Sequence, residues 1–397
     1  MKAASVMTNA PTALEVTRNL IQCPSVTPKE GGALAYLDTL LSPKGFEVQR
    51  PVFSQDGTPD VENLFAKISG GEGPHLMFAG HTDVVPTGDE SLWTLPPFAG
   101  ETKDGKLYGR GAVDMKGGIG AFAAAALKFI ELHGLPQGSI SFLITGDEEG
   151  PALNGTIKLL EWAKERGESF SDAIVGEPTN PDALGDAIKV GRRGSQSGTL
   201  TVTGQQGHVA YPHLAHNPVP VLADIVARLN HAILDHGTDY FQPTNLEFIS
   251  FDVGNETWNL IPKSAKARFN CRYNDVWNPE KIADFVLSHA KDMLPNDNFD
   301  VTLDLQPDIS QVFLTKSESL INNFTASVER ITGRTPDHST DGGTSDARFI
   351  KNYCPVIEFG LVGQTMHKID ENTDIKDLET LSEIYLDFLE HYFGIKG

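Results

Sequence analysis

Imidazole and carboxylate side chains recur directly after apolar segments of this sequence, and their types suit a metal centre. The residues concerned are His81, Asp83, Asp114, Glu148, Glu149, Glu177 and His367. A donor set of imidazole and carboxylate without cysteine favours Zn²⁺ or another borderline divalent ion over Ca²⁺, which takes oxygen ligands alone. Two histidines and at least three carboxylates exceed the ligands of one catalytic zinc. Two ions that share a carboxylate therefore fit the set better than one.

Taken singly, each of these residues has a simpler interpretation. A histidine after a strand is more often structural than a metal ligand, and acids in a turn are usually solvated. The convergence of several such segments is what favours a metal centre. Asp83 lies two residues after His81, on the same side of an extended chain, where its carboxylate could hold the imidazole from behind.

Three adjacent acids, Asp147, Glu148 and Glu149, follow the apolar segment 139–145. Successive side chains of an extended chain point to opposite sides. One of Glu148 and Glu149 can therefore face a metal ion while the other faces a water molecule a short distance away. Bound dications would neutralise the repulsion between these carboxylates and keep them ionised. Asp147 is interpreted as a turn residue.

Segments of strand and helix type alternate through the first half of the chain. Buried strands are predicted over 73–80, 139–145 and 172–179, and helices over 120–134 and 154–167. This alternation predicts an α/β fold with a mixed, largely parallel sheet flanked by helices. Functional groups of such sheets gather beyond the carboxyl ends of the strands, which is where these histidines and acids fall.

The pattern changes after residue 193. Strands are predicted over 198–205, 245–253, 265–275 and 298–306, with helices over 220–234 and 278–294. Their order, β-α-β-β-α-β, is that of a complete ferredoxin-like α+β domain. From residue 308 the chain returns to helix (318–333), buried strand (355–360) and helix (375–393). We therefore predict an α/β domain formed by 1–193 and 308–397 and interrupted by an α+β domain over 194–307.

Composition narrows the classes of partner. The chain has 397 residues, a net charge of −21 and an apolar share of 40%. Such acidity argues against nucleic acid and anionic membranes as partners, because phosphate binding needs a basic face. No apolar run is long enough to cross a bilayer, the N-terminus lacks the apolar core of a secretory signal, and the three cysteines are widely spaced. We therefore expect a cytoplasmic protein with reduced thiols.

Four segments in this order, HTDVVPTGD, GRGAVDMKGG, TGDEEG and GEPT, resemble the di-zinc aminoacylase and carboxypeptidase family of metallopeptidases over nearly the whole chain. The resemblance implies a zinc-exopeptidase-like catalytic domain with two Zn²⁺ per subunit, one of them replaceable by Co²⁺. It implies that His81 and Glu177 bind one zinc, that Glu149 and His367 bind the other, and that Asp114 bridges them. It further implies Glu148 as the general base, Asp83 as the residue that orients His81, and a cis peptide bond after Asp114.

A second set, GRRGS, TVTGQQGHVAYP, NLIP and TDGGTSDARF, resembles the branch of this family that removes a succinyl group from a small amino-acid substrate. The resemblance implies a substrate pocket formed by Arg192, Ser195, Arg272, Gly343 and Thr344. It also implies a homodimer through the inserted domain, in which His208 and Asn259 enter the partner subunit's active site. That branch usually has Asn where this sequence has Gly363, which removes one expected substrate contact.

The basic stretch IKVGRRG admits two interpretations in a chain this acidic. Its Lys189, Arg192 and Arg193 could form a solvated linker, or they could capture carboxylates, for which the guanidinium fork is well suited. The function also has alternatives: another N-acyl-amino-acid deacylase, a carboxypeptidase, or a non-catalytic relative that binds metal. Non-catalytic relatives tend to lose a ligand or the base. Here the five expected ligand positions and Glu148, the expected base, are all intact. Phosphoryl transfer fits poorly, since no GxxxxGK[ST] segment occurs.

Overall fold

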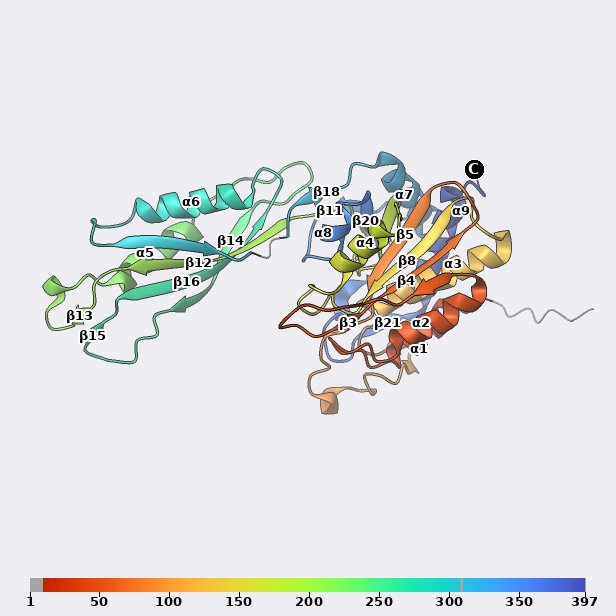
Figure 1. Cartoon of the computed structure of the whole chain (residues 1–397), viewed down its shortest axis with the longest axis horizontal. Helices are drawn as coiled ribbons and strands as arrows, with labels where there is room; N and C mark the ends of the chain where they lie inside the picture. The colour runs from red at the N-terminus through yellow and green to blue at the C-terminus, as the bar shows by residue number, and fades with distance from the viewer. Residues whose placement is uncertain (1–9, 308–309, 397) are drawn as a thin grey trace, which may run out of the picture. The chain divides into compact units, whose positions relative to one another are not determined.

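The computed structural model describes residues 10–307 and 310–396, which divide into two compact units (Figure 1). The first unit is formed by the described parts of Met1–Val190, Thr315–Ser339 and Ser345–Gly397, and the second by those of Gly191–Leu314 and Thr340–Thr344. The units therefore divide at 190/191 and 314/315, whereas the sequence placed the boundaries at 193/194 and 307/308. Residues 1–9, where no secretory signal is predicted, and 308–309 lie outside the described residues.

The main sheet of the first unit has the order β1-β4-β8-β5-β9-β20-β10-β19. Its strands are β1 (Glu47–Gln49), β4 (Leu64–Ser69), β8 (Ser139–Thr145), β5 (His75–His81), β9 (Asp172–Val175), β20 (Val356–Glu358), β10 (Ala187–Lys189) and β19 (Asp337–Ser339). The central strands β8, β5, β9 and β20 are parallel, while β4 and β10 run against their neighbours β8 and β20. The prediction of a mixed, largely parallel sheet is confirmed.

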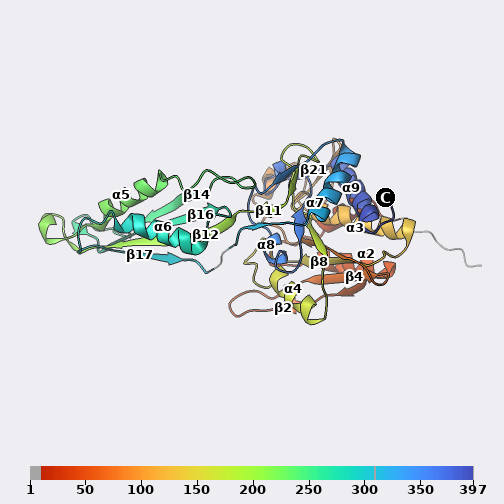
Figure 2. The same cartoon turned by 90° about the horizontal axis from the view of Figure 1, so that it is seen from above.

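Helices flank this sheet (Figures 1 and 2). They are α1 (Ala13–Ile21), α2 (Ala33–Leu41), α3 (Lys116–His133), α4 (Thr156–Glu165), α7 (Glu318–Thr332), α8 (Ala347–Ile350) and α9 (Ile375–Tyr392). The crossover from β5 to β8 steps one way across the sheet, and the crossover from β8 to β9 steps back. Because such crossovers are right-handed, their helices α3 and α4 cover opposite faces. Helix α3 also packs against α1 and α9, and α7 against α9.

Helix α3 is apolar on nearly all sides because it is buried between the sheet and its neighbouring helices. Phe122 of α3 stacks on Phe78 of β5 with ring centroids 4.3 Å apart. The sequence predicted its start at residue 120, but α3 begins at Lys116. Its first turn carries glycines since a side chain at Gly118 would clash with the carbonyl oxygen of Gly176, just after β9. The close approach brings the start of α3 to the carboxyl ends of the strands.

Two small sheets complete the first unit. One has the order β21-β7-β6, with β21 (Asn372–Asp374), β7 (Lys106–Tyr108) and β6 (Thr102–Lys103), and the other pairs β2 (Val52–Phe53) with β3 (Val61–Glu62). Strand β21 leads directly into α9. The segment between β20 and β21, which contains His367, is therefore anchored at one end in the main sheet and at the other in a small one.

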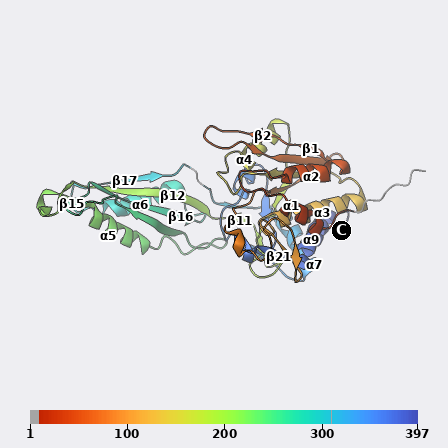
Figure 3. The same ribbon diagram turned by 90° about the horizontal axis from the view of Figure 1, so that it is seen from below.

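The second unit contains the predicted β-α-β-β-α-β order. Its elements are β12 (Gly194–Thr203), α5 (Pro218–Asn230), β14 (Asn245–Asp252), β16 (Ser264–Tyr273), α6 (Pro279–Lys291) and β17 (Asp300–Leu305), and the sheet order is β14-β16-β12-β17. Both helices contact this antiparallel sheet and each other, so that they share one of its faces (Figure 3). Short pairs, β11 (Gly191–Arg192) with β18 (Phe313–Leu314) and β13 (Gly207–His208) with β15 (Leu260–Ile261), lie outside the main sheet.

Side chains of β12 and β16 alternate between a buried and a more open face. Leu200, Val202, Ala267 and Phe269 pack on the helical side, in the core of this unit. Ser195 and Arg272 therefore lie on the open side of the sheet. No helix among residues 10–307 and 310–396 is both long and apolar enough to span a membrane.

Candidate metal centre

The metal ligands proposed from the sequence lie together at the carboxyl edge of the main sheet. His81 is the last residue of β5, Glu148 and Glu149 follow β8, and Glu177 follows β9. Asp114 lies just before α3, and the peptide bond that follows it is cis, as the resemblance implied. His367 comes from the segment between β20 and β21. The parallel strands thus bring together residues that are far apart in the sequence.

Asp114 lies between the two imidazoles. Its Oδ1 is 3.2 Å from Nε2 of His81, and its Oδ2 is 3.2 Å from Nε2 of His367. The outer carboxylates follow the same division, with Glu177 Oε1 3.6 Å from His81 Nε2 and Glu149 Oε1 2.8 Å from His367 Nε2. Each oxygen of Asp114 therefore faces a different histidine, which is the arrangement a bridging carboxylate needs.

Two triplets in this cluster have ligand atoms within 4.8 Å of one another: His81 with Asp114 and Glu149, and His81 with Glu148 and Glu177. His367 is outside both triplets although its Nε2 contacts Asp114 and Glu149. The cluster is buried on the His81 side, where that residue is 1% exposed. It is open on the other side, where the side chain of His367 is 45% exposed. A substrate would therefore approach from the side of His367.

Burial and mutual repulsion make Glu148 and Glu177 hold protons strongly. Burial raises the pKa of Glu148 to about 8, and the charges of Asp346, Glu149 and Asp114 act in the same direction. Burial also raises the pKa of Glu177 well above its usual value, with further repulsion from Asp114. Asp114 is shifted in the opposite direction. Although burial opposes ionisation, its hydrogen bonds with His367 and His81 lower the pKa of Asp114.

The imidazoles are held in the charged form. Hydrogen bonds with Asp114 and Glu149 raise the pKa of His367 to about 10. Burial opposes the charge on His81, but the hydrogen bond with Asp114 and the charges of Glu177 and Glu148 raise its pKa well above the usual value. In the metal-free protein, bound protons thus offset part of the negative charge of the clustered carboxylates.

The donor set fits two divalent metal ions. Asp114, Glu148, Glu149 and Glu177 can carry four negative charges, which two dications would balance. Imidazole and carboxylate are both ligands that zinc-like ions prefer. Because ligands must be deprotonated, metal binding would displace the protons that the metal-free cluster holds.

Asp83 acts differently from the sequence-based expectation. Its carboxylate Oδ1 is 3.7 Å from Nδ1 of His81, which is too long for a hydrogen bond, whereas its main-chain carbonyl oxygen accepts that N–H at 2.9 Å. The buried carboxylate instead accepts the backbone N–H groups of Glu148 at 3.3 Å and Glu149 at 3.1 Å. Asp83 therefore positions His81 through its backbone and the turn that carries Glu148 and Glu149 through its side chain.

Asp147, interpreted from the sequence as a turn residue, is buried and organises the chain that follows the acidic triplet. Its carboxylate accepts the backbone N–H groups of Ala152, Leu153 and Asn154 at 3.2, 2.9 and 2.8 Å. These bonds close the loop that leads into α4. The three adjacent acids thus separate into one that builds the loop and two that face the cluster.

Glu371 is a buried residue of the site that sequence reasoning missed. Its carboxylate accepts hydrogen bonds from Arg110 Nη1 at 2.8 Å and from the backbone N–H groups of Gly111, Val113 and Asp114 at 3.1, 2.9 and 3.2 Å. It lies four residues after His367. Glu371 therefore ties the segment that contains His367 to the segment that contains Asp114. The signal in the sequence was an acid near His367 with no assigned role.

Asp346, in the TDGGTSDARF segment, is a second buried acid without a prior assignment. Its Oδ2 accepts the hydroxyl of Thr156 at 2.6 Å, and its Oδ1 has no hydrogen-bond partner among the described residues. Its charge is one of the causes that raise the pKa of Glu148. Asp346 therefore contributes to the negative field that a bound cation would relieve.

The residues proposed for substrate binding all belong to the second unit. Ser195 of β12 and Arg272 of β16 are direct partners across the two strands. The Ser195 hydroxyl accepts a hydrogen bond from Asn270. Arg192 is buried and donates to the carbonyl oxygens of Asp341 at 3.1 Å and Gly343 at 3.0 Å. It thereby holds the segment Thr340–Thr344, which contains Gly343 and Thr344.

His208 and Asn259 lie beside each other in the second unit. His208 ends β13, Asn259 directly precedes β15, and the Asn259 carbonyl oxygen accepts the N–H of Val209 at 3.1 Å. Both side chains are exposed. At Gly363, in the first unit, an added Cβ would lie no closer than 3.7 Å to another atom. Space alone therefore does not explain the absence of the expected Asn.

Comparison with known proteins identifies the fold. The model of peptidase family M20/M25/M40 matches residues 77–391. An M20 family metallo-carboxypeptidase from Sulfolobus solfataricus superimposes with a TM-score of 0.73 at 17% identity, covering 96% of this chain and 99% of its own. A tripeptidase from Staphylococcus aureus gives 0.75 at 19% identity, covering 96% and 98%. A dinuclear metal-binding peptidase of the M20 family from Bacillus subtilis gives 0.71 at 16% identity, covering 95% and 96%.

The stability of the metal-free protein should fall as the pH rises from 6.5 to 8. The folded-state pKa values of Glu148 (about 8) and His367 (about 10) lie above the ordinary values of 4.5 and 6.5. Such groups stabilise the fold below the unfolded pKa, and this contribution is lost as the pH rises through the folded pKa. We expect the free energy of unfolding to fall by about 2 kcal/mol over this pH range. This value includes only a reduced contribution from the half-exposed His367, because solvent screens its charge.

Urea unfolding of chelator-treated protein at several pH values checks this expectation. Burial lowers the pKa of His75 to about 4, so its contribution to stability rises with pH mainly below this window. Glu148→Gln should make the free energy of unfolding depend less on pH because it removes one titrating group. In the wild-type protein, saturating Zn²⁺ should reverse the sign of this pH dependence. A wild-type stability that is constant or rises with pH in the absence of metal would contradict the expectation.

Replacing Glu371 should loosen metal binding as well as the fold. Glu371→Gln leaves Arg110 buried without its charged partner, at a cost of about 3 kcal/mol. It also weakens the hold on the Asp114 backbone, so that zinc affinity should fall by roughly 10-fold or more. Unfolding curves and competition with a chromogenic zinc chelator measure the two effects.

The control is Glu390→Gln. Glu390 is also buried and ion-paired, but its partner His133 is at the far end of α3. The control should lose stability and retain zinc affinity. Equal zinc affinity in both variants would mean that Glu371 contributes only to the stability of the fold and not to metal binding.

Proposed function

The chain belongs to peptidase family M20/M25/M40, and from this membership we propose that it is a zinc-dependent amide hydrolase acting on N-succinyl-L,L-2,6-diaminopimelate. The products would be succinate and L,L-2,6-diaminopimelate, as part of lysine and diaminopimelate biosynthesis in the cytoplasm. We assign two Zn²⁺ to each subunit, one of which Co²⁺ could replace. His81 and Glu177 would hold one ion, Glu149 and His367 the other, and Asp114 both.

Glu148 is the residue placed to move the proton. Two divalent ions, when bound, would lower the pKa of a water molecule and polarise the amide carbonyl. The Glu148 carboxylate takes a proton from the attacking water as the new C–O bond forms at the carbonyl carbon. It returns that proton to the leaving nitrogen as the C–N bond breaks. The hydrogen bond from its backbone N–H to Asp83 holds the turn that carries this side chain.

The proposal of a succinyl substrate rests mainly on Arg272. Its side chain is partly buried, and it forms no hydrogen bond or ion pair with any residue in the described ranges. Burial and the neighbouring charge of Arg193 lower its pKa, so that a carboxylate beside it would relieve both effects. Ser195, directly opposite, offers a hydroxyl. The proposed substrate carries three carboxylates, and the arginine fork binds such groups bidentately.

We further propose that the second unit forms a homodimer. Apolar side chains are exposed around His208 and Asn259: Val209, Tyr211 and Leu214 on one side, and Trp258, which is 98% exposed, on the other. Such a patch on a soluble protein usually marks an interface. In an isologous dimer the same patch would be covered on both subunits, and His208 would supply a donor to the partner subunit's site.

A succinate-release assay should separate the possible substrates. We expect kcat/KM for N-succinyl-L,L-diaminopimelate to exceed that for N-acetylornithine by at least about 100-fold, because the acetyl group leaves Arg272 unpaired. Arg272→Lys keeps the charge but loses the fork, so that KM for the succinyl substrate should rise about 10-fold or more. Arg268→Lys, on the same strand but exposed, is the matched control and should leave KM unchanged.

Zinc removal by a chelator should abolish this activity, and added zinc should restore it. Preferential hydrolysis of N-acetylornithine or of a tripeptide would overturn the substrate assignment while leaving the amide hydrolase in place. Activity that persists after metal analysis confirms the removal of zinc would overturn the metal mechanism itself.

Subunit exchange tests the role of His208. The homodimers of His208→Ala and Glu148→Gln should each lose about 100-fold or more in kcat. Mixed dimers contain one complete site if His208 acts across the interface, so that activity should return to roughly a quarter of the wild-type value. Exchange of His208→Ala with the double variant is the control and should restore nothing. No recovery in the first mixture would place His208 in its own subunit's site or outside any site.

A further inference from the structure

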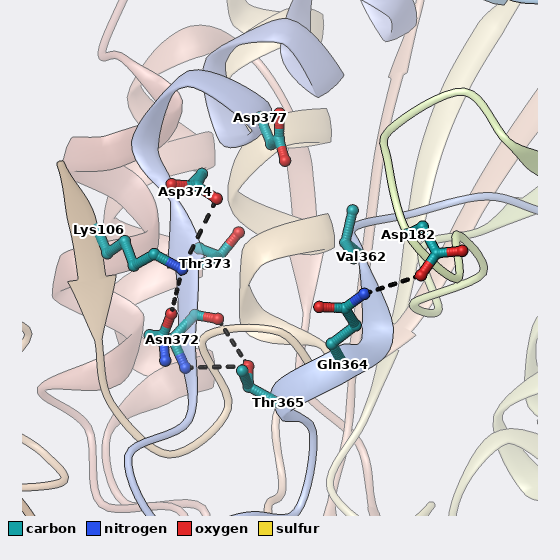
Figure 4. Close-up of a pocket in the computed structure, with 9 residues that line it drawn as sticks. All are labelled: Lys106, Asp182, Val362, Gln364, Thr365, Asn372, Thr373, Asp374 and Asp377. Atoms are coloured by element: carbon teal, nitrogen blue, oxygen red, sulfur yellow. Dashed lines mark hydrogen bonds and ion pairs between the residues drawn. The ribbon is translucent and has the colours of Figure 1, made fainter.

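A second polar cavity lies in the first unit, apart from the metal ligands. It has a volume of about 90 Å³ and is bounded by β7, β21, the start of α9 and the segment 362–365 (Figure 4). Its walls are formed largely by oxygen-bearing side chains, without histidine or cysteine. The chemistry of its lining therefore differs from that of the candidate metal centre.

Three oxygen groups face this cavity without partners. Thr373 is only 5% exposed, yet its hydroxyl is directed into the cavity and forms no hydrogen bond with a described residue (Figure 4). The Asp377 carboxylate likewise forms no hydrogen bond or ion pair within residues 10–307 and 310–396. Gln364 donates its Nε2 to Asp182 Oδ1 at 3.0 Å, which leaves its carbonyl oxygen toward the cavity (Figure 4).

The charges around the cavity do not balance. Three carboxylates line it, those of Asp182, Asp374 and Asp377, against the single ammonium of Lys106. Lys106 Nζ is already placed 3.2 Å from Asn372 Oδ1 and 3.8 Å from Asp374 Oδ2. Burial and the charge of Asp374 raise the pKa of Asp377, and the opposing charges of Lys376 and Lys106 offset this only in part. A divalent ion would supply the missing charge.

We propose that this cavity binds a hard divalent cation of the Ca²⁺ type. Carboxylate, hydroxyl and amide carbonyl oxygens are the ligands that such ions prefer. A volume of about 90 Å³ is several times the roughly 10–15 Å³ that a cavity needs to hold one water molecule. The ion would therefore retain part of its water shell and contact Asp377, Thr373 and Gln364 directly or through water.

An ion at this position would brace the segment that carries His367. Gln364 precedes His367 by three residues and Thr373 follows it by six. A cation held by both would join the two ends of that segment, which also contains Glu371. The expected effect is greater thermal stability of the first unit and slower loss of metal from the centre.

The acidic residues at the start of α9 also have a simpler role. Asp374 and Asp377 lie at the N-cap and in the first turn, where negative charge interacts favourably with the helix dipole by about 0.3–1 kcal/mol. That benefit needs no ion and is independent of Ca²⁺. A measurement of stability with and without Ca²⁺ therefore distinguishes the two roles.

The test uses the full chain loaded with Zn²⁺, so that Ca²⁺ does not compete at the metal centre. Ca²⁺ is titrated at constant ionic strength, with Tm and calorimetric heat as readouts, against Mg²⁺ and methylammonium. We expect saturable Ca²⁺ binding with a rise in Tm, and a loss of affinity of about 10-fold or more in Asp377→Asn and in Thr373→Val. Glu383→Gln removes an exposed charge from the same helix and should bind Ca²⁺ like the wild type.

Two results would overturn the proposal. One is the absence of saturable Ca²⁺ binding, and the other is equal Ca²⁺ binding by wild type, Asp377→Asn and Thr373→Val. A response to methylammonium but not to Ca²⁺ would assign the cavity to an alkylammonium group and equally reject a metal ion. Since Thr373→Val preserves shape and charge, it decides the question even if Asp377→Asn fails to fold. Neither outcome depends on the amide substrate.

Discussion

The repulsion among the clustered carboxylates is the constraint on which the rest of this structure depends. Asp114, Glu148, Glu149 and Glu177 converge on a largely buried cluster, where unpaired charge is costly. Protons and two imidazoles compensate them in the metal-free protein, and two dications would do so in the loaded one. Asp114 is central because each of its oxygens faces a different histidine. The chain must therefore hold several mutually repelling segments at fixed distances.

It does so mainly through backbone hydrogen bonds to buried acids. Asp83 accepts the N–H groups of the turn that bears Glu148 and Glu149, and Glu371 accepts those of the segment that bears Asp114. Asp147 closes the loop that follows Glu148 and Glu149. Charge-assisted bonds of this kind are stronger than neutral ones. The buried carboxylates that make the site costly to fold thus also supply the hydrogen-bond acceptors that shape it. The apolar packing of α3 on β5 supports the site from below.

The regular elements were largely predictable because they depend on local pattern. Strand β8 spans the predicted 139–145, and the order of the second unit follows from alternating and helical periodicity. Helix α3 begins earlier than predicted, because close packing against Gly176 requires glycine in its first turn. Helices α1 and α2 and strand β4 were not predicted. Helix α1 packs on α3 and strand β4 pairs with β8, so contacts with segments far along the chain place both.

By itself, the sequence determined the donor types of the metal centre, the strand ends that carry them and the resemblance to a metallopeptidase family. These properties reside in residue identity and short-range spacing. Only the tertiary structure decided that Asp83 binds the turn of Glu148 and Glu149, that Glu371 joins Asp114 to the His367 segment, and that Thr373 and Asp377 share a cavity with Gln364. Hydrogen bonds such as that from Asp114 N to Glu371 connect positions 257 residues apart. No local pattern encodes such a pairing, because it exists only when the parallel strands bring their carboxyl ends to one edge.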